Sequence, residues 1–577
     1  MIGLLWASER GGALAAHLAA AWPDARCYPE SPAVALPAAW AECDQLIAFM
    51  ATGIAMRLAA PLLADKHHDP GLVCVDDASR FAVALSGGHG GGANQLASRV
   101  ADALGSTAVV TTASDTLGHP ALDGLGADLG FRIEGGADLA AVGAALAAGK
   151  QVALVEDEEQ RWPLPPLPPN VIRFAITAEE APAPCLVVSD RVLTPPRPAV
   201  LYRPPSLLIG VGCSRGATAT EILGLIDQTL TEAGLAPAAV AGLASVDAKR
   251  DEPGLLQAAA ERGWPLAFHP AAQLAGIAVP NPSAAAQQAV GTPSVAEAAA
   301  LAPTVAPLPP SGRAALLVPK RKHERVTVAV ARRHPRGRLY LVGSGPGDLA
   351  LLPPLAREAL ARCELVVGLD RYLEPLRGLL RPGTRMAGSR IGDEQARARL
   401  ALAEARAGIA VALVSGGDAG IYGMASPTLK EAPAETEVEV IAVPGITAAS
   451  AAAALLGAPL GHDHCAISLS DLLTPWEVIR GRLAAAAAGD FVVALYNPRS
   501  AARHWQLAAA RELLLTHRDP ATPVGIVADA FRPGQRVTIT TLGDLDPATV
   551  GMTTIVLVGA SSTQVVAGRM VTPRGYR

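Results

Sequence analysis

The sequence predicts a multidomain α/β protein whose sheets are mainly parallel. Its 577 residues exceed what one ordinary hydrophobic core accommodates, so several domains are expected. Of these residues 50% are hydrophobic and 18% are charged, which is typical of globular rather than disordered chains. Short β-type runs alternate with segments of helical periodicity in both the first and the last part of the chain, a pattern typical of parallel sheets covered by helices.

Charge and hydropathy exclude several classes of protein. The formal net charge of -5 argues against general nucleic-acid binding, which requires a basic surface. The N-terminus reaches Glu9 too early for a signal peptide, and the apolar segment "ASAAAALLGAPLG" is interrupted before it reaches the length of a membrane span. The seven cysteines include no CxxC pair, which favours reduced core thiols over disulfides or a metal site. We therefore expect a cytoplasmic protein that binds neither membrane nor nucleic acid.

Proline clusters and one charged stretch divide the chain. The clusters "RWPLPPLPPN" and "TPPRPAVLYRPPS" cannot lie inside helices or central strands, and the charged "ARRHPRGR" separates two strand-like runs. We therefore expect four parts, namely an α/β domain at 1–125, a middle segment at 126–205, an α/β domain at 206–332 and a larger α/β unit at 336–577.

The first part contains the strand-like runs "IGLLW", "QLIAFM", "LVCVD", "FAVALS" and "TAVVTT", and we expect helices between them. The glycine-rich loop Ser86–Gly92 follows the fourth run and opens a helix that includes Asn94. Unpaired N–H groups at such a helix start bind anions, and basic residues including Lys66 lie nearby in sequence. Without further context, a tight turn beside a solvated charge cluster explains the same residues.

The last part contains the runs "RLYLV", "ELVVG", "VALVS", "VEVIAV", "HCAISLS", "DFVVALY", "PVGIVA", "RVTITTL" and "TTIVLVG". Between the earlier runs lie helical segments such as Pro354–Arg362, which has apolar residues at helical spacing. The closing three runs follow one another without room for a helix, so we expect them to pair antiparallel.

The turn Gly343–Asp348 joins a strand to a helix and has glycine at every second position. A dinucleotide site requires the spacing GxGxxG with an acidic residue about 20 residues later, and this turn lacks that combination. Taken alone, the turn is explained equally well as a connection without a ligand. A dinucleotide-binding redox enzyme is the alternative that this spacing disfavours.

Four later loops favour a ligand site, because each follows a strand-like run and is rich in small residues: "VSGGDAGIYGMAS", "AVPGITAASAAAALLGAPLGHD", "ALYNPRS" and "VADAFRPGQRV". Loops of this kind gather at the carboxyl edge of an open α/β sheet, where a ligand can approach the backbone. In the second loop Pro444-Gly445 makes the turn, and we expect Thr447 to be the N-cap of the next helix.

With these loops the last part resembles the tetrapyrrole methylase family, whose members bind S-adenosylmethionine between two α/β lobes. The motifs "GDAGIYGMAS", "PGITAASAAAALLGAPLGHD", "ISLSDLLTPWEVI" and "YNPRS" resemble precorrin-3B C17-methyltransferase in particular. The resemblance implies a two-lobed fold, S-adenosyl-L-methionine as methyl donor, a precorrin or cobalt-precorrin substrate, ring contraction and a homodimer. The donor-binding residues that it implies are Pro346, Gly416, Gly417, Asp418, Ile421, Thr447, Ala448, Tyr496, Asn497 and Ala530. A sibling methylase acting at another ring position is the alternative.

The implied reaction needs positioning more than acid–base chemistry. Transfer of a methyl group to an electron-rich ring carbon depends on holding that group in line. The implied ring contraction does require proton movement, and by residue type we select Asp348 and Asp471 as catalytic from a set that also includes His462 and Asp463. Asp471 has a competing explanation as the cap of a helix that begins near Leu472.

The N-terminal parts resemble cobalt-precorrin-5A hydrolase, which opens a ring-A δ-lactone and releases acetaldehyde. The motifs are "GIAMRLAAPLLADK", "SGGHGGGAN" and "TTASD", followed by "IGVGCSRGATATEI" and "GLASVDAKRDEPGLLQAAAERGWPL". Lactone opening needs an activated water and a stabilised oxyanion. From residue type we expect His89 to be the base, the N–H groups of Gly90 to Gly92 to receive the oxyanion and Lys66 to hold a carboxylate. A non-catalytic module that binds intermediates is the alternative to this predicted fusion of hydrolase and methyltransferase.

Overall fold

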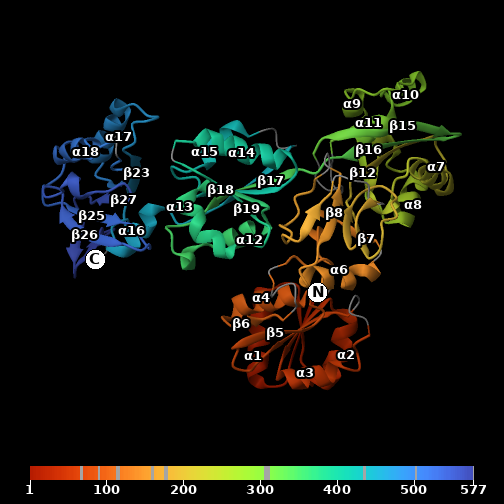
Figure 1. Cartoon of the computed structure of the whole chain (residues 1–577), viewed down its shortest axis with the longest axis horizontal. Coiled ribbons are helices and arrows are strands. Elements are labelled where there is room, and N and C mark those ends of the chain that lie inside the picture. The colour runs from red at the N-terminus through yellow and green to blue at the C-terminus, as the bar shows by residue number, and fades with distance from the viewer. Residues whose placement is uncertain are drawn as a thin grey trace. The chain divides into compact units, whose positions relative to one another are not determined.

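The computed structural model of the chain divides into two compact units (Figure 1). The residues that the structure describes are 1–64, 69–88, 91–111, 117, 119–134, 136–157, 161–174, 180–303, 312–390, 392–432, 437–500 and 503–575. The first unit contains Met1–Arg161, Pro165–Pro335 and Arg381–Gly383, and the second contains Trp162–Leu164, Arg336–Leu380 and Thr384–Arg577.

The first sheet of the first unit has the strand order β2-β1-β3-β4-β5-β6. Its strands are β1 (Ile2–Trp6), β2 (Ala25–Tyr28), β3 (Gln45–Phe49), β4 (Gly71–Val75), β5 (Phe81–Ser86) and β6 (Thr107–Val109). Its helices are α1 (Glu9–Ala21), α2 (Pro32–Glu42), α3 (Thr52–Ala59) and α4 (Ala93–Leu104). Most neighbouring strands are parallel, and their buried side chains pack against the apolar faces of α1 and α4.

One connection in this sheet differs from the prediction of helices between the strands. Strands β4 and β5 pair antiparallel through a short turn without a helix. The Asp76 carboxylate builds this turn by accepting hydrogen bonds of 2.8–3.0 Å from the backbone N–H groups of Ala78, Arg80 and Phe81. An aspartate that satisfies several nearby backbone donors favours a tight reversal of the chain.

Two further sheets belong to the first unit. The sheet β7-β11-β10-β8-β9 contains β7 (Arg132–Glu134), β8 (Val152–Glu156), β9 (Val171–Arg173), β10 (Cys185–Val188) and β11 (Ala199–Arg203), with helix α6 (Leu139–Ala147). The sheet β14-β13-β12-β16-β15 contains β12 (Leu207–Cys213), β13 (Val240–Val246), β14 (Leu266–His269), β15 (Ala314–His323) and β16 (Val326–Arg333). The helices of this last sheet are α7 (Ala219–Glu232), α8 (Pro253–Arg262), α9 (Ala271–Ala275), α10 (Ala284–Val290) and α11 (Val295–Leu301).

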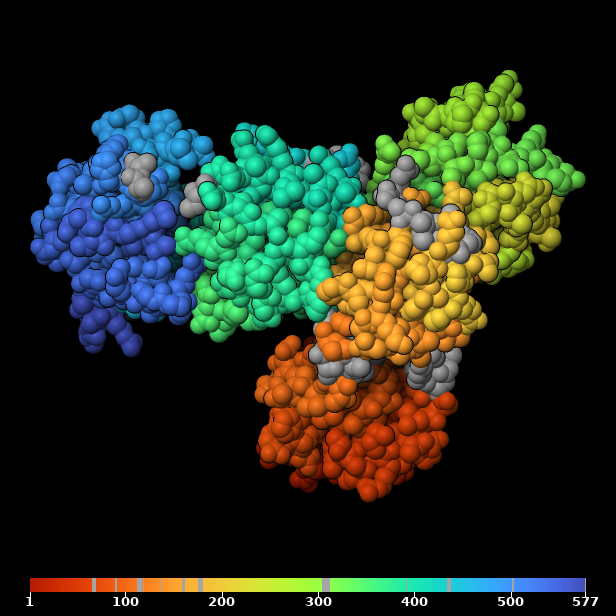
Figure 2. Space-filling model, in the orientation of Figure 1, coloured from red at the N-terminus to blue at the C-terminus, as the bar shows by residue number. Residues whose placement is uncertain are grey.

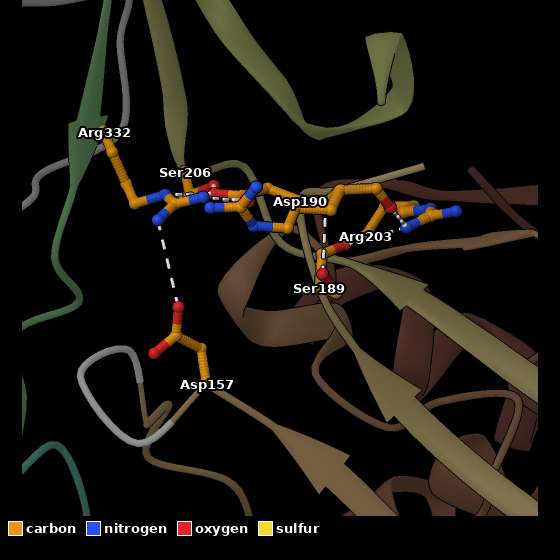
Figure 3. A network of polar contacts seen from close by, with 7 residues as sticks. Asp157, Ser189, Asp190, Arg203, Ser206 and Arg332 are labelled. Carbon is orange, nitrogen blue, oxygen red and sulfur yellow. Dashed lines mark hydrogen bonds and ion pairs between the residues drawn. The ribbon is translucent and has the colours of Figure 1, made fainter. Parts of the chain in front are cut away.

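A buried network of polar groups joins these two sheets (Figure 3). Asp190 follows β10 and is only 2% exposed. Its carboxylate accepts hydrogen bonds from Ser206 Oγ at 2.7 Å and from Arg332 Nε and Nη2 at 2.8 and 2.6 Å. Arg203, also buried, donates from Nη1 to the Ser189 carbonyl at 3.0 Å. Losing one partner of such a buried ion pair leaves an uncompensated charge, so the network holds the two sheets together.

The second unit contains a parallel sheet with the order β19-β18-β20-β17-β21. Its strands are β17 (Gly337–Gly343), β18 (Leu365–Leu369), β19 (Arg385–Ser389), β20 (Ala410–Ser415) and β21 (Val438–Val443). Its helices are α12 (Pro354–Arg362), α13 (Asp370–Leu373), α14 (Glu394–Arg406) and α15 (Ala425–Glu431). Helix α12 was predicted with these bounds, whereas β19 was missed because its residues "RMAGS" contain no apolar run.

The second unit also contains a mixed sheet with the order β23-β24-β27-β25-β26. Its strands are β23 (His464–Ser468), β24 (Val492–Tyr496), β25 (Pro523–Ala528), β26 (Arg536–Thr541) and β27 (Thr554–Val558). The helices α16 (Ala448–Leu456), α17 (Trp476–Ala488) and α18 (Gln506–Leu515) accompany it, and a small sheet consists of β22 (Gly457–Ala458), β28 (Gln564–Val566) and β29 (Arg569–Val571). Strand β25 pairs antiparallel with both β26 and β27, which confirms the predicted pairing of the closing strands.

These sheets confirm the predicted fold class, a multidomain α/β protein with mainly parallel sheets. Close-packed side chains fill the space between the ribbons of each part (Figure 2). Within the described residues, no helix is both long enough and apolar enough to cross a bilayer.

Candidate active site

The turns after β17, β20 and β21 lie directly against one another. Gly345 and Gly417 exchange two backbone hydrogen bonds, Gly345 N to Gly417 O at 3.0 Å and Gly417 N to Gly345 O at 2.8 Å. Both residues have left-handed backbone, with φ of 71° and 70°, which favours glycine. Gly445, after β21, packs so closely that a Cβ there would lie 2.1 Å from the Gly417 carbonyl oxygen. The glycines therefore bring three strand ends to one point.

Asp418 fixes this arrangement from the bend after β20. Its Oδ2 accepts a hydrogen bond from the N–H of Gly445 at 2.9 Å, and its Oδ1 accepts one from the N–H of Gly420 at 2.8 Å. The carboxylate thus ties its own loop to the turn after β21. The geometry gives Asp418 a positioning role, and its contact with a methyl donor stays a prediction.

The Tyr496 hydroxyl, at the end of β24, caps the start of α16. It accepts a hydrogen bond from the N–H of Ala449 at 3.0 Å and shares another with Thr447 Oγ1 at 2.6 Å. Thr447 does occupy the predicted N-cap position, but its hydroxyl makes no cap hydrogen bond, because it faces Tyr496 instead of the helix. Ala448 and Ala530 pack in the same apolar cluster as the Tyr496 ring. Four of the predicted donor residues are therefore neighbours.

Tyr422 and Asn497 complete this side of the site. The Tyr422 ring lies 5.0 Å from the Tyr496 ring, and its hydroxyl donates to the Ala466 carbonyl at 2.9 Å. Partial desolvation raises the pKa of Tyr422. Asn497 donates from Nδ2 to Ser468 Oγ at 3.1 Å, which links the ends of β24 and β23.

Several loops of the site hold a strained backbone. Four non-glycine residues of these loops have positive φ, namely Tyr422 (51°), Asn497 (50°), Asp529 (48°) and Phe531 (55°). Such conformations cost on the order of 1–3 kcal/mol each and persist where the surroundings enforce them, often at functional sites. Ile421, beside Tyr422, leaves an apolar side chain 40% exposed. Nothing in the sequence predicts this conformation at Tyr422 and Phe531, since aromatic residues rarely adopt it.

Sequence reasoning also missed Arg532 and Tyr372. Arg532 donates from Nε to the carbonyl of Pro346, which lies 186 positions earlier in the chain. Tyr372 packs on Gly416, where a Cβ would lie 2.4 Å from the ring. Beside Arg532 is an open cavity of about 510 Å³, lined by Gly347, Asp348, Phe531, Arg532, Pro533 and Gln535. Arg532 belongs to the loop "VADAFRPGQRV", which was predicted to lie near a ligand, but nothing in the sequence predicted its contact with Pro346.

The two aspartates predicted as catalytic in this half lie in different surroundings. Asp348 lines the cavity and accepts a hydrogen bond from the N–H of Ala350 at 2.9 Å. Asp471 accepts one from Gln506 Nε2 at 2.8 Å. The competing explanation of Asp471 as a helix cap is wrong, because Pro475 is the N-cap of the next helix, which begins at Trp476.

The predicted hydrolase residues His89, Lys66 and Gly90 lie outside the described residues. The described part of their loop packs tightly on β4, since a Cβ on Gly71 would lie 2.2 Å from the Gly91 carbonyl oxygen. This close approach explains why glycine is present at both positions.

Four family models match consecutive stretches of the chain. Cobalamin synthesis G N-terminal matches residues 34–115, cobalamin biosynthesis central region matches 120–204 and cobalamin synthesis G C-terminus matches 207–331. Tetrapyrrole (corrin/porphyrin) methylases match residues 338–546, which contain the glycine turns and the residues around Tyr496.

Known methyltransferases resemble about two fifths of the chain. The chain is 44% identical over 247 residues to the cobalt-factor III methyltransferase of Priestia megaterium, covering 42% of this chain and 46%, or about half, of that relative's length. It is 46% identical over 249 residues to the probable cobalt-factor III C(17)-methyltransferase of Salmonella typhimurium, covering 41% of this chain and 99% of that protein. The crystal structure of the methyltransferase CobJ is 39% identical with a TM-score of 0.40, covering 41% of this chain and 100% of that one. Because one such relative is matched almost end to end, the chain belongs to the tetrapyrrole (corrin/porphyrin) methylases.

Proposed function

We propose that residues 336–577 transfer a methyl group from S-adenosyl-L-methionine to C17 of precorrin-3B or its cobalt form, with contraction of the ring. The observation that carries this proposal is the meeting of three glycine turns with the Tyr496 hydroxyl at the ends of the strands. Ligands of open α/β sheets bind at this edge. The relatives named as cobalt-factor III methyltransferases support the substrate class.

The residues around these turns fit the proposed donor. It supplies an activated methyl group when it is bound. Gly417 has no side chain, and a Cβ there would meet only the backbone of the turn Ile446–Ala448 at 3.6–3.7 Å, while the apolar Ile421 side chain is 40% exposed. The remaining residues proposed to contact the donor are Pro346, Gly416, Asp418, Thr447, Ala448, Tyr496, Asn497 and Ala530. Binding against fixed loops holds the reacting groups in line, which is the main requirement of methyl transfer.

Asp348 is the residue that we propose for proton movement during ring contraction, with Asp471 as the second. Asp348 lines the open cavity, so a ring placed there comes within reach of its carboxylate. Asp471 lies beside Gln506, which orients its carboxylate. Replacing Asp348 with Asn should slow ring contraction more than donor binding, whereas equal effects on both would contradict this role.

We further propose that the N-terminal parts open the ring-A lactone of a cobalt-precorrin, with His89 as base and Lys66 holding a carboxylate. The three cobalamin-synthesis family models across residues 34–331 support this assignment.

We also propose a homodimer formed through the methylase half, which sedimentation equilibrium of the full chain tests directly. A monomer at micromolar concentration would contradict it.

The test of the proposed function is the product formed by the full chain. Incubation with S-adenosyl-L-methionine carrying a ¹³C-labelled methyl group and precorrin-3B should place the label on C17, as read by NMR. Label on any other ring carbon would favour a sibling methylase.

The test of the N-terminal parts is the release of acetaldehyde. The wild type should release acetaldehyde from a lactone-containing substrate, and the double variant His89→Ala, Lys66→Ala should not. If the wild type released none, the N-terminal parts would be a non-catalytic binding module.

A further inference from the structure

Arg532 is held over the loop Pro346–Asp348 by contacts that leave part of its guanidinium group free. Its Nε donates to the Pro346 carbonyl. Gly347 has φ of 144°, and a Cβ there would lie 2.6 Å from Arg532 Cγ and 2.9 Å from Cδ. Only glycine therefore lets the arginine side chain cross the loop. Within the described residues, the terminal nitrogens Nη1 and Nη2 make no hydrogen bond.

A second arginine faces the same aromatic ring. The guanidinium carbon of Arg532 lies 5.5 Å from the centroid of Tyr372, and that of Arg371 lies 5.2 Å from it. The ring attracts both cations through its negative face. Tyr372 also packs on Gly416, which belongs to the bend after β20. The two arginines therefore lie next to the proposed donor site.

These two cations have no carboxylate partner among the described residues. Neither guanidinium lies within 4.0 Å of a carboxylate in those parts of the chain. Burial and the neighbouring Arg371 lower the pKa of Arg532, whereas Asp529 acts in the opposite direction. Asp348 lines the same cavity, but its carboxylate accepts the N–H of Ala350. Arg371 therefore acts on Arg532 as a neighbouring like charge.

A ligand carboxylate would relieve this repulsion, because it can accept paired N–H donors from a guanidinium group in a bidentate geometry. We propose that Arg532 and Arg371, arranged around Tyr372, form a subsite for a carboxylate group of a bound ligand. Two ligands of the proposed reaction carry such a group, namely the tetrapyrrole in its acidic side chains and the methyl donor in its amino-acid moiety. The subsite rests on the proposed function, because both sources are ligands of that reaction.

The test compares charged and uncharged probes in the full chain. The tetrapyrrole probes are uroporphyrin and its fully methylated ester, followed by fluorescence titration. The donor probes are S-adenosylhomocysteine and methylthioadenosine, which lacks the amino-acid moiety with its carboxylate and ammonium groups, followed by calorimetry. The variants are Arg532→Gln and Arg371→Gln. Arg377→Gln is the matched control, because this exposed arginine on the same segment pairs with Glu374.

We expect both variants to weaken one charged probe by about tenfold or more while leaving its uncharged counterpart and the Arg377→Gln control unchanged. Weaker uroporphyrin binding would assign the subsite to the tetrapyrrole, and weaker S-adenosylhomocysteine binding would assign it to the donor. Unchanged binding of every probe would overturn the subsite. If the wild type bound neither uroporphyrin nor S-adenosylhomocysteine, the proposed function would be overturned instead.

A second variant keeps the test independent of folding defects at Arg532. Gly347→Ala should displace the arginine and reproduce the loss seen in Arg532→Gln, because the added Cβ occupies the path of the side chain. Arg371 is exposed, so Arg371→Gln should fold normally and melt at the wild-type temperature. If Gly347→Ala bound the charged probe like the wild type, the placement of Arg532 in the subsite would be wrong.

Discussion

The contact between the glycine turns makes Gly445→Ala a severe test of the site. The added Cβ would lie 2.1 Å from the Gly417 carbonyl oxygen, whereas ordinary contact begins near 3.4 Å, so the loops must separate by about 1.3 Å to restore ordinary contact. That shift stretches the hydrogen bond from Gly445 N to Asp418 Oδ2 beyond its present 2.9 Å. Overpacking costs about 1–3 kcal/mol, and a lost hydrogen bond to a charged group costs about 1.5–3 kcal/mol. We therefore expect a total of about 2.5–6 kcal/mol.

Urea denaturation and calorimetric titration with S-adenosylhomocysteine measure this effect in the full chain. If half of this free energy is also lost from the binding of S-adenosylhomocysteine, its affinity for the chain falls by about tenfold or more. The matched control is Gly481→Ala, a helix position with nothing within 4 Å, which should bind normally and gain up to about 1 kcal/mol of stability. If Gly445→Ala bound and unfolded like this control, the close packing of the turns would be wrong.

The remaining predictions concern single polar groups. Tyr496→Phe removes the acceptor of the Ala449 N–H, so the variant should lose about 1–2 kcal/mol of unfolding free energy in urea denaturation. A variant as stable as the wild type would contradict the capping role of the Tyr496 hydroxyl. Burial alone would raise the pKa of Glu297, but surrounding N–H donors hold that pKa below 4.5. A carboxylate of this kind stabilises the fold above its unfolded pKa and loses that contribution as pH falls through its folded pKa. Glu297→Gln should therefore cost about 2–4 kcal/mol near neutral pH, with a difference from wild type that shrinks below pH 4.5; a difference independent of pH would refute this. Asp190→Asn leaves Arg332 without its charged partner and should cost about 3–5 kcal/mol of unfolding free energy, whereas a loss below about 1 kcal/mol would mean that the network is not structural.

The sequence predicted the parts of the fold that local patterns encode. Runs such as "VALVS" and "DFVVALY" became the buried strands β20 and β24, because apolar residues of that kind fill both faces of a covered sheet. Strand β2 and strand β19 escaped prediction, since both are partly exposed and lack an apolar run. The reversal between β4 and β5 also escaped, because it depends on the hydrogen bonds that Asp76 happens to collect.

The site was predictable only where one stretch of sequence contains the signal. The glycines of the three turns were visible as loops, but the pairing of Gly345 with Gly417 joins residues on different strands. The contact of Arg532 with Pro346 likewise depends on the folded chain. Thr447 shows the same limit. Its N-cap position was predicted correctly, but its hydroxyl forms a hydrogen bond with Tyr496 and not with the helix backbone. Local patterns therefore locate the loops, and tertiary contacts decide what each side chain does.

The most direct test of the proposed donor site is calorimetric titration of S-adenosylhomocysteine, and separately of NAD, into the full chain. We expect S-adenosylhomocysteine to bind with one site per chain, NAD not to bind, and Gly445→Ala to abolish or strongly weaken the heat of binding. Binding of NAD, or of neither ligand, would contradict the proposal that the glycine turns hold a methyl donor.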